Sequence, residues 1–290
     1  MRRQLYADLS LLAVVIVWGY TFVAIKNALE GIMPFNFIAL RFIIAFIILL
    51  LVFWKRLHGL NRYVILRGGI VGLFLFFAYG FQTVGLKYTT ASNAGFITGF
   101  SVVLVPVFSA IILKARPSIE STAGVICAIA GIFLLSYNSG YVINKGDILV
   151  FFCALAVAFH ILSVGYYTKR ADSVLLTIVQ VGVVTLLSVT AALVFEKPVI
   201  PHSEVVWEAI IVTSVFATVG AYLVQNIMQR FTSSTHTALI FSGEPVFAGI
   251  FGFYFLGERL GGGSIIGCFL ILAGMVISEV KISGKEEIDS

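Results

Sequence analysis

Apolar stretches recur along the whole chain and are separated by short polar connections. Each stretch has about 20 residues, the length that a helix needs to cross a hydrocarbon core about 30 Å thick. The stretches use nearly all of the chain and leave no room for a soluble domain. We therefore predict an all-α polytopic membrane protein with ten transmembrane helices. The predicted spans are 8–27, 35–54, 66–86, 93–113, 120–138, 147–167, 174–195, 207–229, 236–256 and 263–281.

The pattern also repeats, because residues 68–136 align without a gap with residues 211–279. Matches among Ile, Leu, Val and Phe mean little in so apolar a chain, so the polar and glycine matches carry the argument. Tyr79-x-x-Gln82 falls on Tyr222-x-x-Gln225. The other informative matches are Thr89 with Thr232, Arg116 with Arg259, Gly124 with Gly267 and Gly131 with Gly274.

With five spans in each repeat, the second copy must enter the membrane from the opposite face. We therefore predict two inverted five-helix repeats, residues 1–138 and 139–283, followed by a disordered cytoplasmic tail at 284–290. Internal inverted repeats are typical of secondary transporters that work by alternating access.

The composition agrees with a membrane location. Of the 290 residues, 60% are hydrophobic and 11% are charged, whereas soluble domains have about 25% charged residues. A net charge of +5 is compatible with a nucleic-acid partner, but Lys and Arg gather in the connections on one side of the predicted spans. This positive-inside pattern predicts two cytoplasmic termini and no nucleic-acid partner. We expect a protein integral to the cell membrane, such as a bacterial inner membrane, as a monomer or a homodimer.

Cofactor chemistry is not visible in the sequence. Cys127, Cys153 and Cys268 all fall inside predicted spans and lack metal-ligand spacing. The chain also has no Walker lysine, HExxH motif or GxSxG motif. We therefore expect no catalytic residues, no metal and no cofactor, and no use of ATP by this chain. The partners that remain are the lipid bilayer and a small-molecule substrate.

Polar side chains inside spans indicate where a substrate could bind, since they are costly unless they face a cavity or a partner. The two Tyr-x-x-Gln pairs each share one helix face, and we interpret them as the lining of a shared cavity; matched interhelical hydrogen bonds are the alternative. A histidine in the sixth span could instead be a hydrogen-bonded core residue, and Trp18 could serve packing alone. The predicted cavity residues are Trp18, Tyr79, Gln82, Asn93, His160, Tyr222, Gln225 and His236.

Two charged residues lie about two helical turns inside their spans, Arg41 in the second and Glu244 in the ninth. Arg41 could snorkel to the outer interface or pair with a carbonyl or carboxylate. Glu244 could be a buried carboxyl that supports the kink at Pro245, or it could couple transport to protons. Pro106 and Pro245 lie inside the fourth and ninth spans, where they are expected to kink or open the helix.

Glycine spacing predicts packing rather than binding in the fifth and tenth spans. Gly124 and Gly131, like Gly267 and Gly274, lie two helical turns apart on one face, and small residues let helix backbones approach closely in lipid. At the end of the ninth span, we interpret Glu258 as a charged helix terminus in solvent.

Four segments in combination resemble the EamA-type family of the drug/metabolite transporter superfamily: residues 17–26 (VWGYTFVAIK), 34–42, 95–106 and 243–259. The resemblance covers essentially the full chain. It implies ten helices in two inverted five-helix repeats and transport of small metabolites, often efflux of amino acids or related compounds. It also implies that Arg41 and Glu244 have structural or coupling roles, because they recur in members with different substrates. One departure is Ala115, which stands where the family usually has a carboxylate.

Our hypothesis is a secondary transporter, an exporter of amino acids or related small metabolites, that works by alternating access. A channel-like passive facilitator is the alternative, and a membrane-embedded enzyme is a less favoured one. Protons are a candidate coupling ion because of His160 and Glu244. The sequence does not fix the substrate, the direction of transport, the coupling ion or the oligomeric state.

Overall fold

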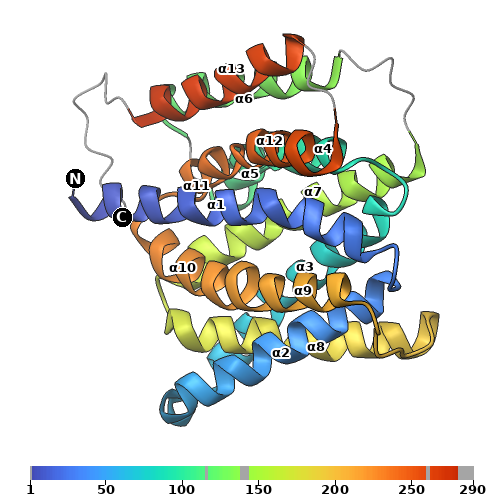
Figure 1. Ribbon diagram of the computed structural model, residues 1–290. Coiled ribbons are helices and arrows are strands. Elements are labelled where there is room, and N and C mark those ends of the chain that lie inside the picture. Colours follow the sequence, from blue (N-terminus) through green and yellow to red (C-terminus); the bar gives the residue numbers. More distant parts are fainter. Residues whose placement is uncertain (1, 115–116, 138–143, 259–261, 280–290) are drawn as a thin grey trace.

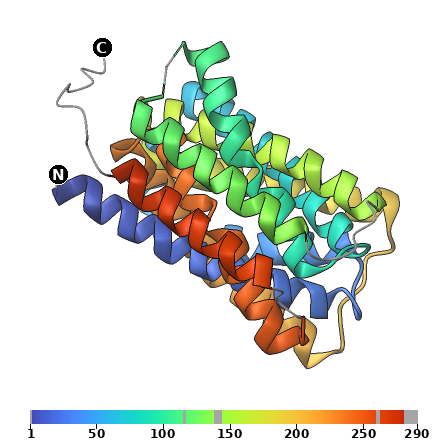
Figure 2. The ribbon, with the colours of Figure 1, turned by 90° about the horizontal axis from the view of Figure 1, so that it is seen from above.

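The computed structural model describes residues 2–114, 117–137, 144–258 and 262–279, and every regular element in these ranges is a helix. The long helices run roughly parallel or antiparallel in one bundle (Figures 1 and 2). The bundle has two ends: we call the one where α1 begins the 'start end' and the one where α1 finishes the 'opposite end'. Ala115, Arg116, Arg259 and the predicted tail lie outside the described residues.

The helices have the following bounds in chain order. They are α1 Arg2–Ala28, α2 Pro34–Phe53, η1 Trp54–Gly59, α3 Arg62–Leu86, α4 Ala91–Gly99, α5 Ser101–Phe108, η2 Ser109–Leu113, α6 Ile119–Tyr137, α7 Lys145–Tyr167, α8 Ser173–Phe195, α9 Glu204–Ser214, η3 Val215–Gly220, α10 Ala221–Met228, η4 Gln229–Phe231, α11 Ser234–Phe241, α12 Glu244–Leu256 and α13 Gly262–Glu279.

Eight helical segments are long and apolar enough to cross a membrane, and they coincide with eight of the ten predicted spans. The all-helical membrane architecture is therefore confirmed. The fifth and tenth predicted spans are the helices α6 and α13. Their described apolar runs, 119–131 and 265–274, are shorter than a span requires, so ten spans stay a prediction.

Polar side chains fix where several helices begin. Asn61, Thr90, Asp172 and Ser233 accept a hydrogen bond from a backbone N–H in the first turn of α3, α4, α8 and α11. Asn144 forms a capping box with the third residue of α7. Such caps satisfy N–H groups that a helix leaves unpaired, a costly defect near lipid.

Three spans are interrupted near their middle. The fourth consists of α4 and α5, which meet at Phe100, and the ninth consists of α11 and α12, which meet at Gly243. Pro245 lies in the first turn of α12, and Pro106 lies inside α5. The expected opening is confirmed at Pro245, whereas the interruption of the fourth span lies at Phe100 and not at Pro106. The eighth span contains the π-helical segment η3 between α9 and α10, which no sequence pattern predicted.

Helices α6 and α13 form a closely packed pair at one edge of the bundle (Figure 1). A Cβ atom at Gly131 would lie 2.6 Å from the Gly267 carbonyl oxygen, and one at Gly274 would lie 2.6 Å from that of Gly124. The four glycines thus make reciprocal backbone contacts. The prediction that these glycines serve packing is confirmed.

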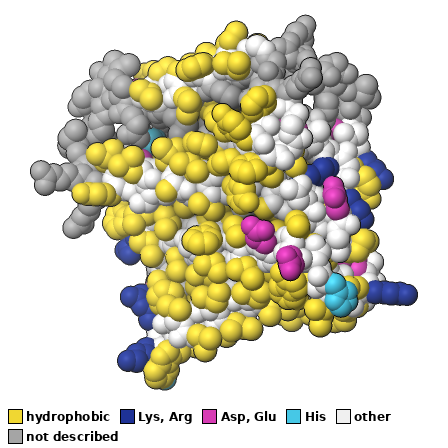
Figure 3. Space-filling view, in the orientation of Figure 1, with side chains coloured by type: hydrophobic (Ala, Val, Ile, Leu, Met, Phe, Trp, Pro, Cys, Tyr) yellow, Lys and Arg dark blue, Asp and Glu magenta, His cyan; other side chains and the backbone are white. Residues whose placement is uncertain are grey.

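The outer surface of the bundle is apolar. Leu51, Phe195 and Tyr254 are among many large hydrophobic side chains that are more than two-thirds exposed. Hydrophobic side chains cover the middle of the face in Figure 3, and Lys and Arg lie toward its left and right margins. This distribution suits a surface that meets lipid between two aqueous ends.

Candidate functional site

A small cavity lies at the centre of the bundle, between the middle parts of several helices. Its walls are the middle parts of α1, α3, α7 and α10 and the two helix breaks, α4/α5 and α11/α12. The polar or aromatic residues that line it are Trp18, Thr21, Tyr79, Gln82, Thr98, Ser101, Cys153, His160, Tyr222, Gln225, Phe241 and Glu244.

Six of the eight predicted cavity residues line this space, namely Trp18, Tyr79, Gln82, His160, Tyr222 and Gln225. Asn93 and His236 do not line it. They belong to the first turns of α4 and α11, and the cavity begins only where those helices end. Their position at the start of a span placed them too near the membrane surface to reach the centre.

Aromatic rings form one wall of the cavity. The Trp18 ring lies 5.5 Å from the Tyr222 ring and 5.1 Å from the Phe241 ring, measured between centroids. The Trp18 indole N–H donates to the Ala217 carbonyl oxygen at 3.0 Å. This bond fixes the ring in place, so Trp18 both packs and lines the cavity.

The repeated tyrosines meet across the cavity. The Tyr222 hydroxyl donates to the Tyr79 hydroxyl at 2.8 Å, and Arg41 Nη2 donates to the same Tyr79 oxygen at 2.9 Å. The Arg41 guanidinium carbon also lies 4.5 Å from the centroid of the Tyr79 ring. The matched positions are therefore joined by a direct hydrogen bond and also line the cavity, so both interpretations of the Tyr-x-x-Gln repeat hold at the tyrosines.

Arg41 is held by the irregular segment η3. Its Nε donates to Thr218 Oγ1 at 2.8 Å and its Nη2 to the Ala217 carbonyl oxygen at 3.3 Å. A π-helical turn shifts backbone carbonyls out of the regular ladder, which makes Ala217 available to a side chain. Arg41 is 1% exposed and does not snorkel. Of the alternatives that the sequence left open, pairing with a carbonyl is the one observed.

His160 contacts both the aromatic wall and α8, and its ring centroid lies 5.8 Å from that of Tyr222. Its Nε2 lies 3.1 Å from Gln180 Oε1, on α8. The ring is buried and still lines the cavity. It is thus a hydrogen-bonded core histidine and a wall residue at the same time.

Glu244 and Gln225 provide the acceptor groups of the cavity. Glu244 begins α12 at the helix break. Gln229 Nε2 donates to the Ile161 carbonyl oxygen, so Gln229 Oε1 is the acceptor for Gln225 Nε2 at 3.2 Å. This orientation leaves the buried Gln225 Oε1 without a hydrogen-bond partner among the described residues.

At the start end, a carboxylate on α1 lies in close contact with an imidazole on α11. His236 Nε2 lies 3.2 Å from Asp8 Oδ1. Both side chains are largely buried, and the two residues come from segments far apart in the sequence. His236 therefore closes the bundle at one end instead of lining its centre.

At the opposite end, two carboxylates tie the bundle together. Asp147 on α7 accepts from the Thr89 hydroxyl at 2.7 Å. Glu258 accepts from the backbone N–H groups of Ala91 and Ser92, and from the Ser92 hydroxyl, at the start of α4. The interpretation of Glu258 as a solvated helix terminus is wrong, because Gly257 turns the chain with a φ of +66° and returns this side chain to α4.

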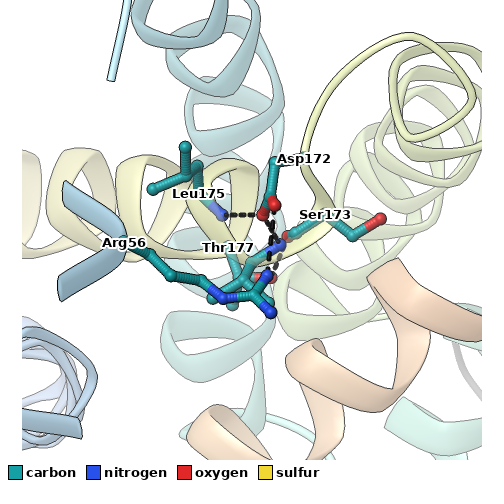
Figure 4. Close-up of polar contacts among 6 residues, drawn as sticks. Arg56, Asp172, Ser173, Leu175 and Thr177 are labelled. Atoms are coloured by element: carbon teal, nitrogen blue, oxygen red, sulfur yellow. Dashed lines mark hydrogen bonds and ion pairs between the residues drawn. The ribbon is translucent and has the colours of Figure 1, made fainter. Parts of the chain in front are cut away.

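A separate contact lies at the surface of the start end. Asp172 caps α8 by accepting from the backbone N–H groups of Val174 and Leu175. The Arg56 guanidinium approaches the same carboxylate at 3.1 Å (Figure 4). Both side chains are exposed, so this pair contributes about 0–1 kcal/mol.

Comparison with known proteins gives matches over nearly the whole chain. The model of the EamA-like transporter family matches residues 5–137 and, a second time, residues 144–279. A protein of Archaeoglobus fulgidus named as an uncharacterized transporter is 37% identical over 282 residues, which cover 97% of this chain and 88% of the relative. The uncharacterized transporter YcxC of Bacillus subtilis is 26% identical over 285 residues, which cover 92% of this chain and 90% of the relative.

A solved crystal structure has the same fold. It superimposes with a TM-score of 0.76 at 20% sequence identity, and the match covers 94% of this chain and 96% of the other.

Proposed function

The chain belongs to the EamA-like transporter family, and from this premise we propose that it is a secondary transporter that exports a small metabolite by alternating access. Amino acids and related compounds are the substrates that we expect. The proposal includes ten membrane spans in two inverted repeats and a cytoplasmic start end. Membership of the family supports a transporter rather than an enzyme.

The central cavity is the observation that carries this proposal. Its walls come from both segments that match the family, 5–137 and 144–279. It lies where the fourth and ninth spans are broken, and broken helices near the middle of the membrane are typical of substrate sites in secondary transporters. A single site shared by two halves is what alternating access requires.

The contacts at the two ends support a pair of gates. Asp8 and His236 join one half to the other at the start end, and Glu258 with Ser92 does so at the opposite end. In the proposed cycle one of these contacts opens while the other stays closed. The substrate then reaches the cavity from one side of the membrane at a time.

Counterflow in proteoliposomes tests the proposal. A pool of metabolites is first screened for compounds that raise the melting temperature of the purified protein, since a bound ligand stabilises by mass action. Vesicles loaded with the compound found should then accumulate its labelled form transiently against its gradient. Ala78→Trp, which fills the cavity wall, should abolish counterflow, whereas Leu51→Trp on the exposed surface should not.

The competing functions give different results. A channel-like facilitator would give flux in proportion to the gradient without counterflow, and an enzyme would convert the compound. Proton coupling is an additional part of the proposal. Proton coupling would be refuted if a pH gradient did not change uptake in either the wild type or the Glu244→Gln variant.

A further inference from the structure

Building on the proposed function, and narrowing its substrates from amino acids to related amines that lack the carboxylate, we infer that the cavity binds a small organic amine that carries one positive charge. The charges of the cavity wall are the first reason. Among the described residues that line it, Glu244 is the one acid, and His160 is the one basic side chain. No Lys or Arg of the described lining faces the space, so an anionic substrate would meet no fixed positive charge.

The partial charges at the helix ends do not change the sign of the charge in the cavity. The breaks bring the C-termini of α4 and α11 to the cavity together with the N-termini of α5 and α12. A helix N-terminus carries a partial positive charge and a C-terminus a partial negative one, so the two ends at each break oppose one another. The Glu244 side chain therefore decides the local charge.

Arg41 does not supply an anion site. Its Nε and Nη2 are bound to Thr218, Tyr79 and the Ala217 carbonyl oxygen. It does not line the cavity, and Tyr79, to which it donates, does. The Tyr79 side chain, and not the guanidinium, is therefore the part of this pair that a substrate in the cavity meets.

The acceptors of the cavity wall favour a substrate that donates hydrogen bonds. Gln225 Oε1 is buried without a hydrogen-bond partner among the described residues, and the half-buried Glu244 carboxyl lines the same cavity. A buried acceptor without a donor is unfavourable, because its lost hydration is not replaced by another hydrogen bond. An ammonium group offers both the charge and the N–H donors that these atoms lack.

The aromatic wall suits the rest of such a molecule. Trp18, Tyr222 and Phe241 form a continuous surface of rings on the cavity. Aromatic faces attract cations and accept flat apolar groups. An arylalkylamine can place its ring on this wall while its ammonium group reaches Glu244.

Three probes of matched shape test the inference on the purified full-length protein. Phenethylamine, 2-phenylethanol and 3-phenylpropionate share a phenyl ring on a short chain and differ in charge. Affinity is measured from the rise in melting temperature with probe concentration. We expect phenethylamine to bind at least about tenfold more tightly than the other two, since a charge-assisted contact is worth more than about 1.4 kcal/mol.

Variants connect that preference to the proposed site. Glu244→Gln should weaken phenethylamine binding about tenfold or more, and Glu244→Asp should keep most of it. Asp172→Asn is the control, because it removes a carboxylate from the surface pair with Arg56 and can still cap α8. Monodisperse elution and an unchanged response to 2-phenylethanol show that the Gln variant is folded.

Three outcomes would overturn the inference: equal or tighter binding of 3-phenylpropionate, no response to phenethylamine, or unchanged phenethylamine affinity in Glu244→Gln. The proposed function fails separately. A neutral or anionic compound that shows counterflow would refute the amine site and leave the transporter intact. Glu244-dependent amine binding without counterflow of any bound compound would support the amine site and refute the transport function.

Discussion

Tyr79 and Tyr222 occupy matched positions in the two family segments, yet their hydroxyl groups have different partners. The Tyr79 oxygen accepts from both Arg41 and Tyr222, whereas the Tyr222 hydroxyl serves as a donor to Tyr79. Asymmetry at the level of single atoms thus arises within a repeated motif. Its source is Arg41 on α2, which donates to the Tyr79 hydroxyl.

We predict unequal effects of removing the two hydroxyls. Tyr79→Phe leaves two buried donors, from Arg41 and Tyr222, without an acceptor, so it should destabilise the protein by about 1–3 kcal/mol. Tyr222→Phe leaves Tyr79 bound to Arg41, so we expect a smaller loss of stability than from Tyr79→Phe. The melting temperatures of the purified single and double variants measure this difference.

The double variant provides the control within the same experiment. Because Tyr222 has lost its acceptor once Tyr79 is changed, adding Tyr222→Phe should cost little more, and the effects should not add. Equal losses from the two single variants, adding fully in the double variant, would show that the two hydroxyls are not coupled and would contradict the Arg41–Tyr79–Tyr222 network.

At the scale of elements, the packing of α6 on α13 rests on glycine. Gly131→Ala places a Cβ 2.6 Å from the Gly267 carbonyl oxygen and 3.0 Å from the backbone nitrogen of Ile271. Backbone atoms cannot move aside as a side chain does, so the helices must separate. We predict a loss of stability of about 1–3 kcal/mol, measured by thermal unfolding in detergent.

A glycine of α3 offers a matched control. A Cβ at Gly69 would have no neighbour within 4 Å, and Ala is favoured over Gly inside a helix by about 0.5–1 kcal/mol. Gly69→Ala should therefore be neutral or stabilising. A melting temperature of Gly131→Ala equal to or above that of Gly69→Ala would contradict the close packing of α6 on α13.

Much of the fold was predictable at this scale because the membrane imposes it. A segment of about 20 apolar residues satisfies its backbone only as a helix, and Pro245 marked one helix break correctly. The π-helical segment η3 was not predictable, since its composition is ordinary and its role depends on Arg41, far away in the sequence. Periodicity describes single helices and says little about contacts between them.

The site was predictable where residues are repeated and lie near mid-span. The two Tyr-x-x-Gln pairs gave four wall residues, and Trp18 and His160 followed from their depth. Asn93 and His236 were placed wrongly because they open their spans. Glu258 and Asp8 were missed as contacts between halves, because a charge at a span end gives no sign of whether it faces water or another helix.

For the molecule as a whole, alternating access predicts that the two ends affect the cavity in opposite ways. Cys153 is a native reporter, since it lines the cavity and is fully buried in this conformation. With Cys127→Ser and Cys268→Ser, a membrane-impermeant maleimide should react only when the cavity opens to the side of addition. Right-side-out and inside-out vesicles allow each side to be tested separately.

Asp8→Asn weakens the contact with His236 at the start end, and Glu258→Gln weakens the contact with Ser92 at the opposite end. A loss of about 1 kcal/mol from either contact shifts the conformational equilibrium about fivefold. Asp8→Asn should therefore speed Cys153 labelling from the side of the membrane that faces the start end and slow it from the other side, and Glu258→Gln should do the opposite. Reciprocal change is the signature of one cavity shared by two gates, because the open states compete for the same molecules. If both variants instead speed labelling from both sides, the two ends open independently, and the protein is a gated channel.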